Sequence, residues 1–117
     1  MFIAGNILRV NSPKKVHNPK TNEETTKVIV LVEMMMKGKP RRVPVSCFGT
    51  LADKAWDVLE KGRSVKFSVV INSMYKKEES DYSIQICASS FTYGTRLYLP
   101  FGEQDADPDK KEKREYQ

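Results

Sequence analysis

Alternation between apolar and polar residues is the strongest pattern in the chain, and it predicts a protein built mainly of strands. In residues 41–48, Val43, Val45 and Cys47 alternate with an arginine, a proline, a serine and Phe48. Successive side chains of a strand point to opposite faces. The valines and Cys47 are therefore predicted to face a core, and the other set, which ends at Phe48, is predicted to face outwards.

Four further stretches are predicted to be strands, at residues 1–10, 24–36, 64–71 and 81–89. The run 28–32 is continuously apolar, which favours a strand covered on both faces. Gly5 interrupts the first stretch, and a glycine inside a strand often marks a bulge or a close backbone approach. The last two stretches each carry one apolar face, formed by Val65, Phe67, Val69 and Ile71 and by Tyr82, Ile84, Ile86 and Ala88.

One short helix is predicted between residues 50 and 61. Its apolar residues recur at helical spacing on one face: Leu51, Ala52, Ala55 and Leu59. Thr50 is predicted to cap the first turn with its side-chain oxygen, and Asp53 suits the positive end of the helix dipole. Gly62 is predicted to end the helix, because glycine adopts the left-handed conformation easily.

The remaining segments are predicted to connect these elements. Prolines and asparagines predict a loop at 11–22. A tight turn is predicted at 37–40 and a hairpin tip at 73–80. Residues 91–101 are less regular and predict a further strand or an arm. Residues 102–117 are polar and charged, which predicts a disordered tail or a frayed helix. The chain is thus divided into a domain at 1–101 and a tail at 102–117.

The order of the elements is three strands, one helix and two strands. An all-β chain of this size, with short strands, long polar hairpins and one helix between the third and fourth strands, fits the five-stranded Greek-key barrel called the OB-fold. We therefore expect an OB-fold domain.

Composition indicates where in the cell the protein is expected. Charged residues make up 30% of the chain, and no apolar run approaches the ~20 residues of a membrane span. The first residues lack the features of a secretory signal, so we expect a cytoplasmic protein without a membrane partner. Cys47 and Cys87 lie in predicted strands, where two buried thiols are favoured over one disulfide bridge.

The net charge of +5 is distributed unevenly. Residues 103–117 hold six acidic and four basic side chains, so residues 1–102 carry a net charge of +7. A basic body of this size suggests a polyanionic partner, although charge alone also serves solubility.

The chain offers little for catalysis. It has no glycine-rich phosphate loop, and its single histidine, His17, is not accompanied by cysteines that would complete a zinc site. Cys47 is predicted to face the core and has no histidine partner in sequence, which argues against a nucleophilic role. We expect no enzymatic activity, no cofactor and no metal.

Basic loops interleaved with aromatic residues are the strongest chemical signal. In an OB-fold these loops are expected on the same side as the outer face of the second and third strands, where they would form a groove for a single nucleic-acid strand. The candidate binding residues are Lys14, Lys15, Lys37, Lys39, Arg41, Arg42, Phe48, Lys66, Tyr75, Lys76 and Lys77. The alternative is that the lysines are only solvated.

Three positions leave alternatives open. Phe48 lies on the outer face by alternation, but a twist at the strand end would turn it into a contact with the helix. Trp56 is predicted to pack in the core or against the helix rather than to stack on a base. Residues 34–36 are three methionines that suit either an adaptable contact surface or a strand end.

The central run resembles the bacterial and phage family of single-stranded DNA-binding proteins. The matching pattern is Phe48-Gly49-x-Leu51-Ala52-x-x-Ala55-x-x-x-Leu59-x-Lys61-Gly62-x-x-Val65, with a weaker match at Gly5-Asn6-Ile7. The resemblance implies an OB-fold that assembles, often as a tetramer, and binds single strands without sequence preference. Phe48 matches a base-stacking aromatic of that family, and Tyr75 and Lys76 lie near another.

Two features depart from the family pattern. Arg42 stands where many members carry a stacking tryptophan on the third strand, so affinity is expected to depend more on charge. The chain ends Lys113-Arg114-Glu115-Tyr116-Gln117 rather than in the acidic Asp/Ile/Pro/Phe motif that recruits replication partners. A short tail of mixed charge suggests a phage or plasmid version.

The sequence therefore predicts a non-catalytic protein that coats single-stranded DNA in replication, recombination and repair. Its expected partners are single-stranded DNA, copies of itself in a dimer or tetramer, and replication or recombination proteins. The alternatives are an OB-fold adaptor, such as a primosome accessory subunit, and an RNA-binding OB domain. Direct competition between DNA and RNA separates the last alternative, because selection of RNA requires contacts to the 2′-hydroxyl.

Overall fold

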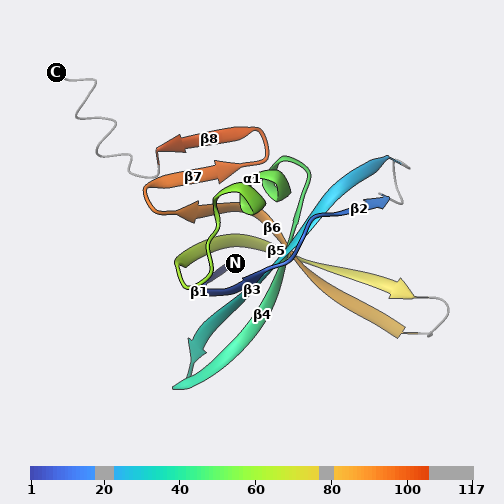
Figure 1. Cartoon of the computed structure of the whole chain (residues 1–117). Coiled ribbons are helices and arrows are strands. Elements are labelled where there is room, and N and C mark those ends of the chain that lie inside the picture. The colour runs from blue at the N-terminus through green and yellow to red at the C-terminus, as the bar shows by residue number, and fades with distance from the viewer. Residues whose placement is uncertain (18–22, 77–80, 106–117) are drawn as a thin grey trace.

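Eight strands and one helix make up the described part of the chain (Figure 1). The computed structural model describes residues 1–17, 23–76 and 81–105, and only the backbone of 74–76, 81–83 and 104–105. The elements are β1 (Phe2–Val10), β2 (Lys14–His17), β3 (Glu24–Met36), β4 (Lys39–Phe48), α1 (Thr50–Val58), β5 (Ser64–Lys76), β6 (Asp81–Tyr93), β7 (Arg96–Leu99) and β8 (Gly102–Asp105).

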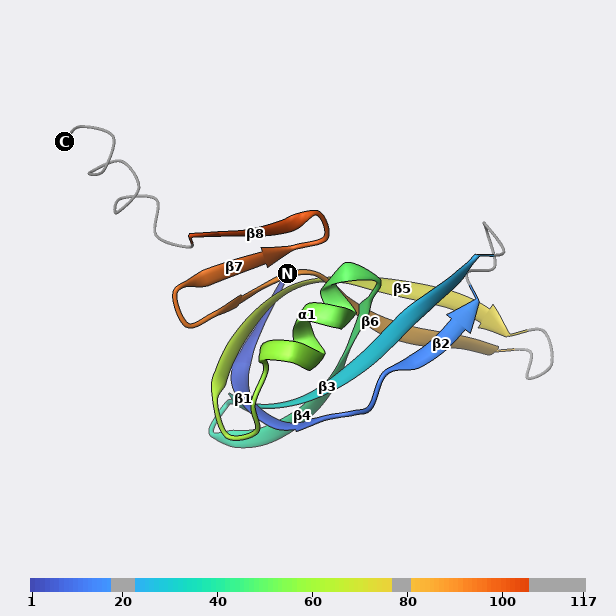
Figure 2. The same cartoon turned by 45° about the horizontal axis from the view of Figure 1, so that its top comes forward.

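Five of these strands close into a barrel. Strand β1 pairs with β3 on one side and with β5 on the other, and both pairings are antiparallel. Strand β5 pairs with β6, and β4 closes the ring by pairing antiparallel with β3 and parallel with β6. The helix α1 lies between the third and fourth barrel strands in sequence and packs beside the barrel (Figure 2). The predicted OB-fold is confirmed.

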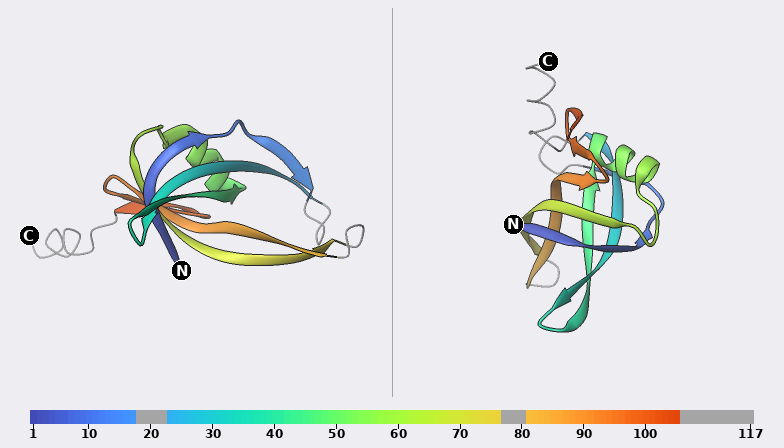
Figure 3. Two further views of the ribbon diagram at one scale, coloured as in Figure 1. Left: turned by 90° about the horizontal axis from the view of Figure 1, so that it is seen from below. Right: turned by 90° about the vertical axis from the view of Figure 1, so that its left-hand side faces the viewer.

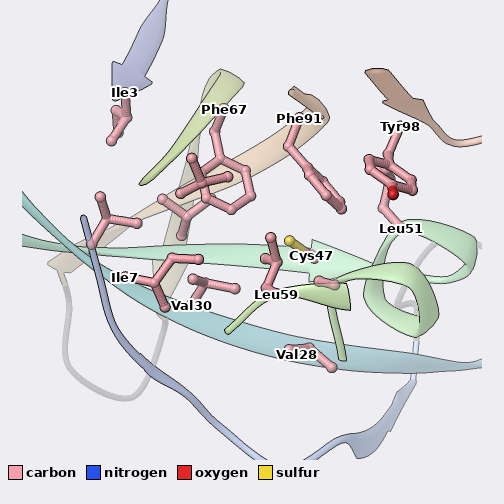
Figure 4. Packing of buried hydrophobic residues seen from close by; sticks show 14 of the residues in the cluster. Ile3, Ile7, Val28, Val30, Cys47, Leu51, Leu59, Phe67, Phe91 and Tyr98 are labelled. Carbon is pink, nitrogen blue, oxygen red and sulfur yellow. The ribbon is translucent and has the colours of Figure 1, made fainter. Parts of the chain in front are cut away.

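The barrel interior is filled by the alternating apolar residues of its strands (Figure 4). Phe67 and Phe91 are fully buried, with ring centroids 5.5 Å apart, and Phe91 stacks on Tyr98 of β7 at 4.7 Å. Val45 and Cys47 are fully buried as predicted. Each large apolar side chain buried in this way contributes about 1.5–3 kcal/mol.

Helix α1 packs against the barrel through Leu51, Ala52 and Ala55, which confirms the predicted apolar face of the helix. The predicted ends are wrong. Gly49, at φ 62°, occupies the N-cap position, and Thr50 is already helical and forms no capping hydrogen bond. Gly62 does adopt a positive φ of 89°, but it does so in the turn before β5, because the helix has already ended at Val58. No helix in the described ranges is long and apolar enough to cross a membrane.

Gly5 marks a close backbone approach, as the sequence predicted. A Cβ atom at this position would collide with the carbonyl oxygen of Glu33. Only glycine lets β1 pass this close to β3 while it also pairs with β5. The tight crossing keeps the core residues Ile3 and Ile7, on either side of Gly5, inside the barrel.

Two arms extend beyond the barrel (Figure 3, left). One is β2 paired with β3, and it contradicts the prediction of an unbroken loop at 11–22. The other is the far part of β5 and β6, whose strands run to Lys76 and from Asp81, into the predicted hairpin tip. The alternation placed Ile71 and Ile84 on the apolar faces of their strands, but they are 49% and 71% exposed, because the arm has left the barrel.

The chain continues past the barrel into the hairpin β7–β8. Strand β7 confirms the further strand predicted within 91–101, and β6 extends to Tyr93 rather than ending near residue 89. Strand β8 pairs with β7 and occupies the first residues of the segment predicted as an irregular tail. The rest of that tail, residues 106–117, lies outside the described residues, as do residues 18–22 and 77–80.

Candidate nucleic-acid interface

The outer face of β3 and β4, called here the β3–β4 face, brings together several predicted site residues. Directly paired residues of two strands share a face, so the register defines its rows. From one end to the other the rows are Lys27 with Phe48, Ile29 with Ser46, Leu31 with Pro44, and Glu33 with Arg42. The parallel bridge from Ser46 to Cys87 continues the face onto β6 and β5.

A basic and aromatic row lies at one end of the face. Lys14 of β2 pairs with Lys27 of β3, which pairs with Phe48 of β4. The ammonium group of Lys27 lies 5.8 Å from the centroid of the Phe48 ring. Phe48 is half-buried and is absent from the buried core cluster, so the outward interpretation of this residue holds.

Lys27 was not among the predicted site residues, although the alternation of the strand contained the signal. The neighbouring Val28 is fully buried, so Lys27 must point to the opposite face. Lys15 was predicted to bind but lies on the other face of β2, where its ammonium group donates a hydrogen bond to Thr26 Oγ1 at 3.0 Å. It therefore stands apart from the Lys14, Lys27 and Phe48 row.

The β3–β4 hairpin forms the opposite end of the face and carries four predicted cations. Lys37 lies in the turn with a positive φ of 52°. Lys39 and Arg41 are exposed on β4, but they alternate with Arg42 and pair with Met36 and Met34, so they lie on the other side of the hairpin. Arg42 Nε lies 3.9 Å from Glu33 Oε2, and its side chain is 72% exposed. Lys39 and Phe48 lie nine positions apart along β4, a length of about 30 Å. The predicted basic loops therefore bound the face from both ends rather than meeting at one.

The floor of the face is neutral and polar where β4 meets β6. Gln85 Nε2 donates a hydrogen bond to Ser46 Oγ at 3.4 Å, and Asn72 Nδ2 donates one to Cys87 Sγ at 3.3 Å. Burial raises the pKa of the Cys87 thiol, and the Asn72 hydrogen bond and nearby Lys27 partly oppose that rise. At neutral pH the floor therefore adds no negative charge to the basic ends of the face.

Both cysteines are free and buried, which confirms the prediction of two thiols. Cys47 points into the core, where burial and the nearby Cys87 raise its pKa from 9.0 to about 12. Its thiol is therefore protonated and unreactive at neutral pH.

The remaining predicted residues lie elsewhere. Lys66 pairs with Ala4 and Thr92 on the outside of β1, β5 and β6, away from the β3–β4 face. The structure describes Tyr75 and Lys76 only by their backbone, which is part of the β5 arm. Their side chains are not described, and Lys77 lies outside the described residues. They stay predictions.

The exposure of the side chains decides the predictions for Trp56 and for the three methionines at 34–36. Trp56 was predicted to be a packing residue, but it is 47% exposed on the flank of α1. Among the methionines, Met34 packs against the core, and Met35 and Met36 are exposed at the hairpin. Within the ranges that the structure describes, no group of three or more His, Cys, Asp or Glu residues could hold a metal ion.

Comparison with known proteins gives a limited result. No protein-family model matches the sequence. No curated protein matches it. Among solved structures, the chain is similar to the SSB domain of a protein from Synechococcus sp., with 17% sequence identity and a TM-score of 0.49. The match covers 84% of this chain and 91% of that domain.

Proposed function

We propose that the protein binds single-stranded nucleic acid, and DNA in particular, on the β3–β4 face without catalysing a reaction. The observation that carries the proposal is the row of Lys14, Lys27 and Phe48 on the outer face of the sheet. A ring beside cations is the combination that binds single strands, because the cations neutralise phosphates and the ring stacks on a base.

The β3–β4 face suits a single strand better than a duplex. Ile29 and Leu31 are half-exposed between the two basic ends and offer apolar contact to unpaired bases. A length of about 30 Å accommodates several nucleotides, within the ~4–16 nucleotides that OB-fold domains bind. Stacking on Phe48 requires an accessible base face, which a closed duplex hides. Because every base has such a face, binding does not depend on sequence.

The biological role follows from this chemistry as part of the same proposal. Exposed single strands arise in DNA replication, recombination and repair, so the protein would coat them there, in the cytoplasm of its host. The sequence resemblance around residues 48–65 supports this role, and the proposal includes a phage or plasmid origin.

Self-association is also part of the proposal. In β1, residues Phe2 to Gly5 pair with β5, whereas the pairing with β3 begins at Asn6. Gly5 lies against Glu33 of β3, so it is the other edge of residues 2–4 that offers backbone groups to a further strand. The first strand of a second copy is the proposed occupant, giving a dimer or a larger assembly.

The test is a fluorescence-anisotropy titration of labelled oligo-dT at about 50 and 200 mM salt, with duplex DNA and oligo-U as competitors. We expect salt-sensitive binding that only single-stranded DNA displaces. The double variant Lys14→Ala, Lys27→Ala should weaken binding and reduce the slope of log affinity against log salt by about 1.4, since each phosphate contact on a single strand contributes about 0.7.

The matched control is Lys54→Ala on α1, which should leave that slope unchanged. Binding no tighter than millimolar at low salt would refute the proposal. Displacement by oligo-U more readily than by oligo-dT would instead indicate an RNA-binding domain.

A protein–protein adaptor is the second candidate function. It is favoured by two exposed aromatic residues away from the β3–β4 face, Trp56 at 47% and Phe101 at 85% exposure. Exposed aromatic side chains are typical of protein interfaces. Weak DNA binding together with an intact fold would move the function to this candidate.

A further inference from the structure

A second hollow lies on the outside of the barrel, across β1, β5 and β6. It is open and has a volume of about 750 Å³. Ala4 and Gly5 of β1 line it together with residues 63–66 and 92–94. The small side chains of β1 leave the hollow unfilled, whereas the longer side chains of β5 and β6 form its walls.

The walls carry two cations, each paired with an aromatic ring. The Arg63 guanidinium lies 5.7 Å from the Tyr93 ring centroid, and the Lys66 ammonium lies 4.5 Å from that of Phe2. Phe2 is 63% exposed, which is unusual for a phenylalanine. Arg63 also lies 3.9 Å from Glu60, but both side chains are exposed, so this ion pair is weak.

A neutral path connects the hollow with the β3–β4 face. On the outside of β5, alternate residues run from Lys66 through Ser68 and Val70 to Asn72, which lies beside Cys87 on the floor of that face. Ser89 donates a hydrogen bond to Ser68 at its carbonyl oxygen, 3.0 Å away, so hydroxyl groups line the middle of the path. Neither residues 64–72 nor residues 85–92 include an acidic side chain.

Acidic side chains lie on other surfaces of the protein, which distinguishes this path from its surroundings. Outward positions of α1 include Asp53 and Asp57, and the β3–β4 face itself includes Glu33. A polyanion that leaves the β3–β4 face over β6 and β5 therefore meets hydroxyls, amides and finally two cations. From Cys87 to Thr92 the distance is five residues of β6, about 17 Å, which a few more nucleotides would cover.

We infer that the hollow is a second contact surface for the same single strand, which rests on the function proposed above. Arg63 and Lys66 neutralise phosphates there, and Phe2 and Tyr93 supply rings for bases. A short oligonucleotide fills the β3–β4 face alone, whereas a longer one continues over β5 to the hollow.

The experiment measures the affinity of the full chain for oligo-dT of about 5 and about 16 nucleotides. The double variant Arg63→Ala, Lys66→Ala should bind the short oligonucleotide within about twofold of wild type. It should bind the long one about fivefold or more weakly, with a salt slope smaller by about 1.4. The control variant Lys54→Ala, Lys61→Ala removes the same charge from α1 and the turn after it, and should change neither affinity.

Several outcomes would overturn the inference. The first is an unchanged affinity of the Arg63→Ala, Lys66→Ala variant for the long oligonucleotide. The second is an equal loss of affinity in the control variant, which would indicate only long-range electrostatics. A change of oligomeric state in sedimentation, with unchanged affinity per protomer, would assign the hollow to contacts between copies. A wild-type protein that binds neither oligonucleotide would refute the proposed function as well, so the two failures are distinguishable.

Discussion

The inner and outer faces of the barrel wall differ in the burial and chemical character of their side chains, and β4 has residues on both faces. Its inward residues Val45 and Cys47 are fully buried and belong to the apolar core cluster. Its outward residues include Phe48, which is half-buried beside Lys27, and Arg42, which is largely exposed beside Glu33. The inner face is defined by volume and apolarity, whereas the outer face is defined by particular chemical groups in solvent. Substitutions on the two faces should therefore affect different measurements.

The largest expected effect tests the inner face. Phe67→Ala removes a fully buried ring that packs against Phe91, and should reduce the free energy of unfolding by about 3–5 kcal/mol. Urea denaturation measures this loss. The control is Val70→Ala on the outer side of the same strand, where the side chain is 52% exposed and the loss should be below about 1 kcal/mol. Equal losses would mean that the two faces do not differ as described.

The next effect tests the outer face. Phe48→Ala should weaken binding to oligo-dT by about 5- to 150-fold, which corresponds to the ~1–3 kcal/mol of one stacked base. The unfolding free energy should change far less than in Phe67→Ala, because Phe48 is only half-buried. Phe48→Trp keeps an aromatic ring and should retain binding. Wild-type affinity in Phe48→Ala would show that this ring does not stack on a base.

A pH series tests the burial of Cys47, a residue of the inner face. Its pKa rises from 9.0 to about 12 on folding, so above pH 9 the unfolded chain loses a proton that the folded protein retains. The stability that Cys47 contributes is thus complete below pH 9 and declines as the pH rises. Between pH 9 and 10 the decline is about 1 kcal/mol, measured as the unfolding free energy of wild type relative to Cys47→Ala. A constant difference between the two proteins over this range would contradict the burial of this thiol.

The smallest effect concerns the ion pair on the outer face. Glu33→Gln removes a carboxylate 3.9 Å from Arg42 and should strengthen binding to oligo-dT by a few-fold, since exposed pairs contribute about 0–1 kcal/mol. Arg42→Ala should weaken binding and lower the salt slope by about 0.7. If both variants weaken binding, Glu33 contacts the strand or orders the hairpin rather than competing with phosphate.

The sequence by itself determined the inner face of the barrel and the order of its five strands and its helix. Alternation is a local property, so Val45, Cys47 and Phe67 could be assigned to the core from their neighbours alone, and a strand order with one helix indicated the barrel. The same alternation failed at Ile71 and Ile84, because a pattern does not reveal where a strand leaves the barrel. The cap predicted from the side chain of Thr50 was also wrong, because Gly49, with a positive φ of 62°, occupies the N-cap position.

Only the tertiary structure decided how the outer residues group. Pairing between distant strands brings Lys14, Lys27 and Phe48 into one row and turns Lys15 away from it. The same pairing moves Lys66 from the predicted groove to a separate hollow beside Phe2. The physical reason is that burial selects residues one strand at a time, whereas a binding surface depends on register between strands. Register is fixed by the whole barrel and is not encoded in any single stretch.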